Sequence, residues 1–548
     1  MNFLQNSGLL TQIFAFCLFF LCTYYETWLI ILSMNSTITV IPRPLSTEGG
    51  NKTVRFSSKA VSIINKATGS DMRRKMETAF SVAGVELSES GIPVYVEFNP
   101  APGNLDKISE AYTLSVSEEG IKIQAETETG TFYGCITAGQ LITGAGAGTE
   151  AELPELTITD KPEHIWRGFL LDTARSFYSV NFIKKMLDAC ALHKLNIFHW
   201  HLTDDQGWRF EVPGYPKLTE IGSKRQDNTL PAAEEGFYDE EKIFRRWYTD
   251  SEIKEIVQYA QERCIQIVPE VEFPGHSSAL LASYPEYGCT GGPYQVENRW
   301  GIFPDVLCLG NDGIFDIYKA ALLKIAELFP SKHIHIGGDE CPHERWTECP
   351  KCRARMEKEG LDSPEQLQAW GTTKIAAMVA SIGKIPIGWD EVLDNNKHNN
   401  LPDNVIVQSW RGTEGGIKAA SLNHKVIMSP CPFFYLNFKN KDSFEESGRL
   451  GVTTSKKTYS FSPAGKELNL EKPEQRDLIL GGECALWTEK LPHSRDAEYL
   501  LFPRFCAAAE ALWLPENKKN FEDFKLRIES HKKLLHKLDY RFYEGELE

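Results

Sequence analysis

The feature that most constrains this chain is a repeated order of strand, loop and helix that begins near Trp166 and continues to Trp513. Helical segments lie between most of the strands. Eight strands that alternate with helices predict an α/β fold, a closed (β/α)8 TIM barrel. The candidate strands are Gly168–Asp172, Leu195–His201, Ile265–Glu270, His333–Gly338, Ile385–Trp389, Val405–Trp410, Lys425–Ser429 and Leu478–Cys484.

Two of the intervening helices carry recognisable start signals. Thr249 and Glu252 have the spacing of a capping box at the start of a helix that reaches Arg263. A second helix is predicted over Pro364–Ile382, with Ser363 as its N-cap and a proline in its first turn. A further helix is expected over Asn181–His193.

With 548 residues the chain is too long for one compact core. Residues 35–160 predict a small α+β domain, with strands at Pro93–Phe98, Tyr112–Val116 and Ile121–Ala125 and a helix over Thr131–Leu141. The sequence Asp-Lys-Pro at 160–162 marks its boundary with the barrel domain, expected over 161–515. Residues 516–548 predict a charged, helical C-terminal extension.

Residues 1–34 are interpreted as a signal peptide or a membrane anchor. Ile13 to Leu32 is almost wholly apolar, interrupted by Glu26, and is long enough to span a bilayer. No Lys or Arg precedes Arg43, so the basic segment typical of a signal peptide is missing. An export signal is preferred to a retained tether, and either interpretation predicts an exported protein, periplasmic or secreted.

The composition is that of a globular protein, with 42% hydrophobic and 24% charged residues. A net charge of −16 argues against nucleic acid or an anionic membrane surface as a partner. Neither the charge nor the composition indicates an oligomeric state.

Thirteen cysteines suggest local cross-links in an exported chain. Cys289 and Cys308 flank a loop rich in glycine and proline and are predicted to form a disulfide. The alternative is a zinc site formed by Cys341, Cys349, Cys352 and His343, although a second Cys-x-x-Cys is absent.

Acidic and aromatic residues gather at the predicted carboxyl ends of the strands, where catalytic groups of such barrels lie. Hydrolysis of a glycosidic bond needs an acid for the leaving group and a group that stabilises the developing positive charge. The sequence contains no glycine-rich phosphate loop, so these residues indicate carbohydrate hydrolysis without a cofactor or a metal. The strand-end residues are Asp172, Arg175, His199–Arg209, Glu270, Asp339, Glu340, Trp389–Glu391, Trp410, Tyr435, Trp487 and Glu489.

The sequence His-Ile-Gly-Gly-Asp-Glu at 335–340 resembles the catalytic signature of glycoside hydrolase family 20, the β-N-acetylhexosaminidases. The resemblance covers about residues 36–515 and includes further motifs in family order: Trp-Arg-Gly at 166–168, His199 to Trp208, Pro269 to His276, Gly-Trp-Asp-Glu at 388–391, Gln-Ser-Trp at 408–410 and Gly481 to Trp487.

The resemblance implies an exo-acting enzyme that releases terminal N-acetylglucosamine or N-acetylgalactosamine from a glycan. It implies that Glu340 is the general acid and base, while Asp339 and Tyr435 hold the substrate's 2-acetamido group, whose oxygen attacks the anomeric carbon. The remaining implied roles are sugar contacts by Trp389, Trp410 and Trp487, hydroxyl binding by Arg167 and Glu489, and support of Glu340 by Asp204 and His276.

One position departs from the family pattern. Asn437 stands where the family usually has an aspartate that binds the outer hydroxyls of the sugar. Asparagine keeps the hydrogen bonds and loses the charge, so the preference between gluco and galacto sugars stays open. The competing functions are release of a disaccharide, an inactive sugar-binding protein and a membrane-tethered adhesin.

Overall fold

The structure is a computed structural model that describes residues 38–64, 70–98, 109–146, 148–224, 247–394, 401–443, 446–470 and 472–548. The predicted leader at 1–34 lies outside these residues. Within the described ranges, no helix is long and apolar enough to cross a membrane.

Eight parallel strands close into a barrel, which confirms the predicted fold class. Their order around the barrel is β11-β12-β13-β14-β15-β18-β7-β8. The strands are β7 (Trp166–Asp172), β8 (Ile197–His201), β11 (Gln266–Glu270), β12 (His333–His335), β13 (Ile385–Trp389), β14 (Ile406–Ser409), β15 (Val426–Met428) and β18 (Ile479–Leu486). Every residue of β7 and β8 is buried, because helices cover the outside of the barrel and side chains fill its centre.

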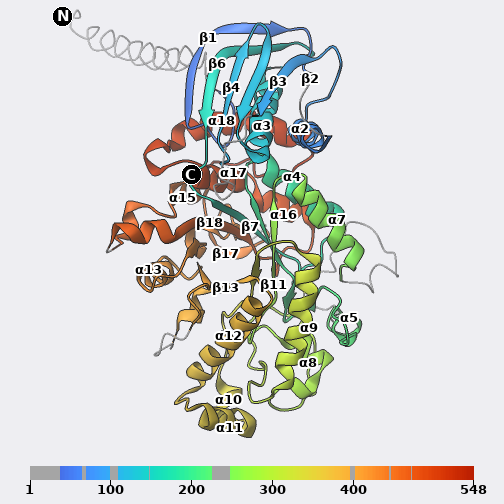
Figure 1. The fold of residues 1–548 in the computed structure, drawn as a ribbon, viewed down its shortest axis with the longest axis vertical. Coiled ribbons are helices and arrows are strands. Elements are labelled where there is room, and N and C mark those ends of the chain that lie inside the picture. Colours follow the sequence, from blue (N-terminus) through green and yellow to red (C-terminus); the bar gives the residue numbers. More distant parts are fainter. Residues whose placement is uncertain are drawn as a thin grey trace, which may run out of the picture.

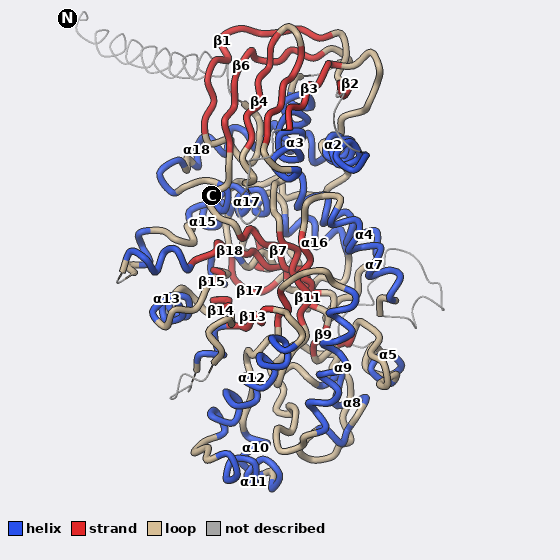
Figure 2. The backbone as a smooth tube through the Cα atoms, viewed as in Figure 1, coloured by secondary structure: helices blue, strands red, loops and turns tan. Residues whose placement is uncertain are grey.

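Helices surround the barrel (Figure 2). The predicted capping box is present. The Thr249 side chain accepts a hydrogen bond from the Glu252 amide, and the Glu252 carboxylate accepts one from the Thr249 amide. Ser363 likewise accepts from the Gln366 amide, as predicted. The helices that follow the strands are α4 (Val180–Leu192), α7 (Asp250–Gln261), α9 (Gly313–Leu328), α12 (Pro364–Ser381), α13 (Glu414–Ser421), α16 (Ser494–Leu501) and α17 (Arg504–Trp513).

The N-terminal domain is a six-stranded sheet with the order β1-β6-β4-β5-β3-β2. It lies at one end of the molecule, above the barrel in Figure 1. Its helices α2 and α3 contact each other, and α2 also contacts α4 of the barrel. Its elements are β1 (Ser46–Phe56), β2 (Val61–Ile64), α2 (Ser70–Val82), β3 (Ile92–Phe98), β4 (Tyr112–Ser117), β5 (Gly120–Ala125), α3 (Glu128–Gly144) and β6 (Ala151–Asp160).

Buried ion pairs join this domain to the barrel. Lys194 Nζ lies 3.0 Å from Asp160 Oδ2, and both side chains are fully buried. Asp160 also accepts a hydrogen bond from the Trp513 indole at 2.9 Å. The C-terminal helix α18 (Phe521–Lys537) adds Arg527, which pairs with Glu510 at 2.6 Å and donates to the backbone oxygen of Val40. The two domains and α18 therefore share one tightly bonded joint.

Candidate active site

A pocket at the carboxyl ends of the barrel strands brings together most of the predicted site residues. The acids Asp339 and Glu340 lie in it together with Tyr435. The full lining is Arg175, His276, Trp300, Gly301, Ile302, Asp339, Glu340, Trp410, Tyr435, Arg449, Trp487 and Glu489. Acids and aromatic rings thus face one space, as a sugar-binding site requires.

A tight turn after β12 lets two consecutive acids reach the same pocket. The strand ends at His335, three residues before the predicted end, and the chain then passes through positive φ at Gly337, Gly338 and Glu340. A Cβ atom on Gly337 would lie 1.9 Å from a carboxylate oxygen of Glu272, so only glycine fits there. Side chains of adjacent residues in a regular strand would point to opposite faces.

Glu340 has the properties of a general acid. Its side chain is 35% exposed, and that of Asp339 is 13% exposed. Burial, and then the negative charge of Asp339, raise the pKa of the Glu340 carboxyl above its ordinary value. A carboxyl group with a raised pKa holds its proton closer to neutral pH.

His276 connects the acid pair to a buried network. Its Nε2 lies 3.5 Å from Asp339 Oδ2 and 3.7 Å from Glu340 Oε2, and its Nδ1 lies 3.3 Å from Asp204 Oδ1. Burial disfavours the charged imidazole, but Asp204 and Asp339 outweigh it and raise the pKa of His276 well above its ordinary value. His276 is therefore a cation that faces the acid pair.

Asp204 is itself tightly held. Arg175 lies 2.7 Å from Asp204 Oδ2, and His201 Nε2 lies 2.9 Å from the same oxygen. Although burial opposes it, the charges of Arg175 and His276 hold the pKa of Asp204 well below its usual range. Asp204 thus stays ionised and fixes His276 in place.

Three aromatic rings form one side of the pocket. Trp410 stacks on Tyr435 with ring centroids 6.1 Å apart, and Trp487 lies 6.0 Å from Tyr435. Trp389 lies deeper, 1% exposed, and its indole donates to Glu270 at 2.9 Å. It packs against Trp487 at 5.9 Å, so it supports the wall and does not line the pocket.

The pocket presents buried polar atoms that no protein group satisfies. These include Asp339 Oδ1 and the indole nitrogen of Trp487. Buried polar groups normally have a partner, so unsatisfied atoms at a pocket indicate where a ligand's polar groups bind. One acceptor and one donor are thus available for a polar substrate.

The predicted substrate contact of Arg167 is wrong. Its guanidinium is fully buried, lies 2.7 Å from Glu110 and donates to the backbone oxygens of His164 and Lys194. Arg167 stands near the start of β7, so its side chain lies at the opposite end of the strand from the pocket, toward the N-terminal domain. Arg175, just beyond the carboxyl end of β7, lines the pocket instead.

Glu489 and Asn437 line a small pocket that adjoins the catalytic one, and Glu489 lines both pockets. Trp300 and Arg449 are among the other residues of the small pocket. The side-chain oxygen of Asn437 is buried and unsatisfied. Burial raises the pKa of Glu489, although Arg175 acts in the opposite direction. This region could bind the outer hydroxyls of a sugar.

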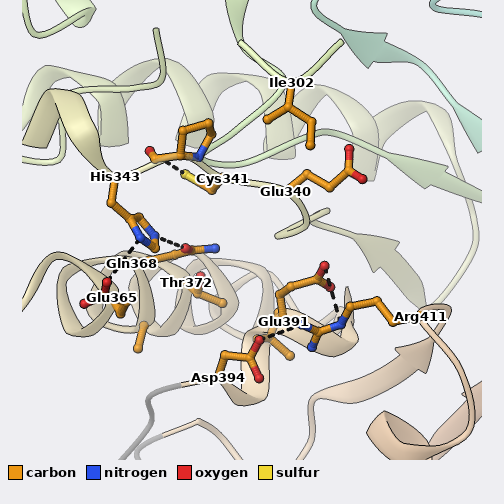
Figure 3. A pocket seen from close by; sticks show the side chains of 13 residues that line it. Ile302, Glu340, Cys341, His343, Glu365, Gln368, Thr372, Glu391, Asp394 and Arg411 are labelled. Carbon is orange, nitrogen blue, oxygen red and sulfur yellow. Dashed lines mark hydrogen bonds and ion pairs between the residues drawn. The ribbon is translucent and has the colours of Figure 1, made fainter. Parts of the chain in front are cut away.

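A second, larger cavity of about 340 Å³ adjoins Glu340 (Figure 3). Glu340 and Ile302 line both cavities. Glu391 also lines the larger one and accepts a hydrogen bond from the Trp410 indole at 3.0 Å. Burial, and then the charges of Asp339 and Asp390, raise the pKa of Glu391 to about 9. The sequence placed Glu391 at a strand end but gave no signal of this protonation.

The predicted disulfide between Cys289 and Cys308 is wrong. Both are free thiols, as is every other cysteine among the described residues. The Sγ atoms of both residues lie near that of Cys352, so the two are not paired with each other alone. Cys341 and His343 of the alternative zinc site lie elsewhere, on the cavity beside Glu340.

A pocket of paired acids and aromatic rings at the strand ends of a (β/α)8 barrel defines a glycoside hydrolase. The chain belongs to glycosyl hydrolase family 20: the model of that family's catalytic domain matches residues 164–516, and the model of its domain 2 matches residues 37–161. The resemblance found in the sequence is thereby confirmed.

Relatives of known name agree. A beta-hexosaminidase of Porphyromonas gingivalis is 35% identical over 90% of this chain, which spans 62% of that protein's length. A beta-hexosaminidase of Akkermansia muciniphila is 35% identical over 78% of this chain, and the match spans 84% of that protein's length. Among solved structures, an exo beta-N-acetylglucosaminidase of Vibrio harveyi in complex with N-acetylglucosamine has a TM-score of 0.79 and 29% identity, covering 93% of this chain and 78% of that one.

Proposed function

We propose that this protein is an exo-β-N-acetylhexosaminidase that removes terminal non-reducing N-acetylglucosamine or N-acetylgalactosamine from glycans with retention of configuration. The observation that carries the proposal is the turn that directs Asp339 and Glu340, whose pKa is raised, into one aromatic pocket. The names of the relatives support the substrate class.

The sugar binds in the pocket of Tyr435 and Trp487, and the leaving group lies in the larger cavity, because Glu340 lines both and can reach the bond that joins them. The acetamido oxygen of the substrate attacks the anomeric carbon while Glu340 gives its proton to the departing glycosidic oxygen. The C–O bond breaks and an oxazolinium ion forms. Asp339 accepts a hydrogen bond from the acetamido nitrogen and stabilises its growing positive charge.

Water then completes the reaction. Glu340, now a carboxylate, takes a proton from the water that attacks the anomeric carbon, and the five-membered ring opens to restore the acetamido group. Two inversions at one carbon give net retention. Glu391 is a poor candidate for an enzyme nucleophile, because a pKa of about 9 keeps it protonated at neutral pH.

Exo action is supported by the buried charges at the inner side of the pocket. Arg175 is held by Asp172 at 3.3 Å and by Asp204 at 2.7 Å, and it lines the pocket with Glu489. In the proposed function, these charged groups receive the hydroxyls of the sugar at the non-reducing end.

The deciding experiment compares nitrophenyl β-N-acetylglucosaminide with the matching β-glucoside, which carries a 2-hydroxyl group. We expect turnover of the first and almost none of the second. Proton NMR of the first product formed should show the β-anomer. Efficient hydrolysis of the glucoside, or a sugar ester trapped on a carboxylate of the enzyme, would contradict the mechanism. Disaccharide in place of monosaccharide as the first product from a long chitin oligosaccharide would contradict removal of single terminal sugars.

We also propose that the enzyme works outside the cytoplasm, because the apolar segment from Ile13 to Leu32 has the length and character of an export signal or a tether. Cell fractionation with the full-length chain tests this. Activity confined to the cytoplasm would contradict it, and carbonate-resistant membrane activity would identify a retained anchor.

A further inference from the structure

Four cysteine sulfurs meet in one cluster outside the catalytic pocket. Cys289 and Cys308 come from the segment between β11 and α9, and Cys349 and Cys352 come from the start of α11 (Pro350–Glu359). The Sγ of Cys352 lies 3.8 Å from that of Cys289 and 3.6 Å from that of Cys308, and Cys308 lies 3.7 Å from Cys349. All four sulfurs lie within 4.8 Å of one another.

These separations match a tetrahedral metal centre. A disulfide holds its two sulfurs about 2.05 Å apart. Zinc binds thiolates at about 2.3 Å, and a regular tetrahedron with that radius places the four sulfurs about 3.8 Å from one another. Three of the six sulfur–sulfur distances are 3.6 to 3.8 Å and all six are within 4.8 Å, so a small adjustment lets the cluster accept the ion.

The surroundings suit negatively charged sulfur. The backbone amide of Gly310 donates a hydrogen bond to the sulfurs of Cys308 and Cys352. A Cβ atom on Gly310 would lie 2.2 Å from the carbonyl carbon of Lys351, so glycine allows this close approach. Cys349 is the N-cap of α11 and Cys352 stands in its first turn, where the helix dipole favours negative charge.

We propose that Cys289, Cys308, Cys349 and Cys352 bind one structural zinc ion. Four protein thiolates fill the tetrahedron, and three of the four residues are buried, so no position is open for a substrate. The cluster differs from the site considered in the sequence by two members, because Cys289 and Cys308 replace Cys341 and His343. Cys349-Pro-Lys-Cys352 supplies two ligands in a Cys-x-x-Cys motif. The other two ligands, Cys289 and Cys308, have eighteen residues between them.

The ion would connect two segments that shape the active site. The segment between Cys289 and Cys308 carries Trp300 and Ile302, which line the catalytic pocket although they are 64% and 54% exposed. The other segment, which leads to Cys349 and Cys352, begins directly after Glu340. In Figure 1, α10 (Glu344–Glu348) and α11 lie together at the end of the molecule farthest from the N-terminal domain. Zinc therefore fixes the position of the pocket rim relative to the chain that follows the acid pair.

Elemental analysis of the full-length protein, purified without a metal-binding tag and without reductant, tests the proposal directly. We expect about one zinc per chain. Alkylation after denaturation in chelator should label all four cysteines, since none is oxidised. No bound metal, iron in place of zinc, or disulfides among these residues would each overturn the proposal.

Variants locate the ligands. Cys308→Ser and Cys349→Ser should each lose the zinc, whereas Cys264→Ser, a matched removal of a thiol outside the cluster, should keep it. If the ligand variants do not fold, cobalt substitution of the wild-type protein gives the same answer, through the intense sulfur-to-cobalt absorption of a tetrathiolate site. Absence of that absorption, or zinc retained in both ligand variants, would overturn the assignment.

A third measurement tests the link to the active site. Hydrogen exchange after chelation should increase in residues 289–308 and 341–352 and stay unchanged in β7. This readout does not depend on activity, so it separates failure of the zinc proposal from failure of the proposed function. Unchanged exchange in both segments would show that the ion does not hold them.

Discussion

At the scale of single residues, Glu340 and Asp339 have different roles, and the negative charge of Asp339 helps to raise the pKa of Glu340. Glu340→Gln removes the proton donor and keeps the shape of the side chain. We expect a large loss of kcat/KM on substrates with poor leaving groups and a smaller loss on nitrophenyl substrates, which need little protonation. Paired kinetics on a chitin oligosaccharide and a dinitrophenyl glycoside measure both. Equal losses would contradict the acid role.

The pH dependence follows from the same pair. The negative charge of Asp339 helps to raise the pKa of Glu340, so Asp339→Asn should lower it. A general acid works only while protonated, so the alkaline limb of kcat/KM should move to lower pH in the residual activity of this variant. The pKa of Glu340 can also be followed by NMR with labelled glutamate. An unchanged or higher pKa would show that Asp339 is not the charge that raises it.

Arg175 gives a third residue-scale prediction. Arg175→Lys keeps a positive charge but cannot contact Asp172, Asp204 and Gln206 at once. We expect kcat/KM to fall by about 10-fold or more, because charge-assisted hydrogen bonds contribute about 1.5–3 kcal/mol each. Steady-state kinetics and circular dichroism measure the loss and the integrity of the fold. Wild-type kinetics would exclude Arg175 from the site.

The sequence predicted the acid pair, but the pocket arginine was assigned to Arg167, whereas Arg175 lines the pocket. Arg167 is the second residue of the first barrel strand and Arg175 lies just beyond its carboxyl end, so the direction of the strand already favoured Arg175. Burial and partners decide this: Arg167 contacts Glu110 of the N-terminal domain, about 57 positions away in sequence. The protonation of Glu391 and the cysteine cluster likewise depend on contacts between distant segments.

At the scale of elements, the capping box of α7 is a local feature with a measurable contribution. Thr249→Ala removes the side-chain oxygen that accepts from the Glu252 amide. Loss of an N-cap costs about 0.5–2 kcal/mol. Denaturant unfolding should show that decrease, while Lys254→Ala on the exposed face of the same helix should change stability by less than about 0.5 kcal/mol. Equal effects would mean that the cap contributes little.

Elements with a strong apolar pattern were predictable, and those without it were not. Barrel strands such as β7 and β15 are rich in apolar residues because both of their faces are buried. By contrast, β1 carries Gly49, Gly50 and charged residues and lies at the edge of its sheet, and β6 contains Pro154. Such residues weaken the strand signal, and pairing with distant strands stabilises these segments instead.

At the scale of the whole molecule, the joint between the two domains depends on buried charges. Arg167 and Glu110 form one such pair, and Lys194 and Asp160 form another. Burial of an ion pair gives little net stability, yet removal of one partner leaves the other charge uncompensated. The joint therefore tolerates replacement of both residues of an ion pair better than replacement of one of them.

This asymmetry yields the last prediction. Arg167→Met should lower the free energy of unfolding by about 3–5 kcal/mol, because Glu110 is left buried without its cation. The double variant with Glu110→Gln should recover part of that loss. Since Arg167 lies outside the catalytic pocket, KM measured on the folded fraction should match the wild type. Denaturant unfolding and kinetics after removal of aggregates measure the two effects. A raised KM with unchanged stability would return Arg167 to the substrate-binding role that the family resemblance implied.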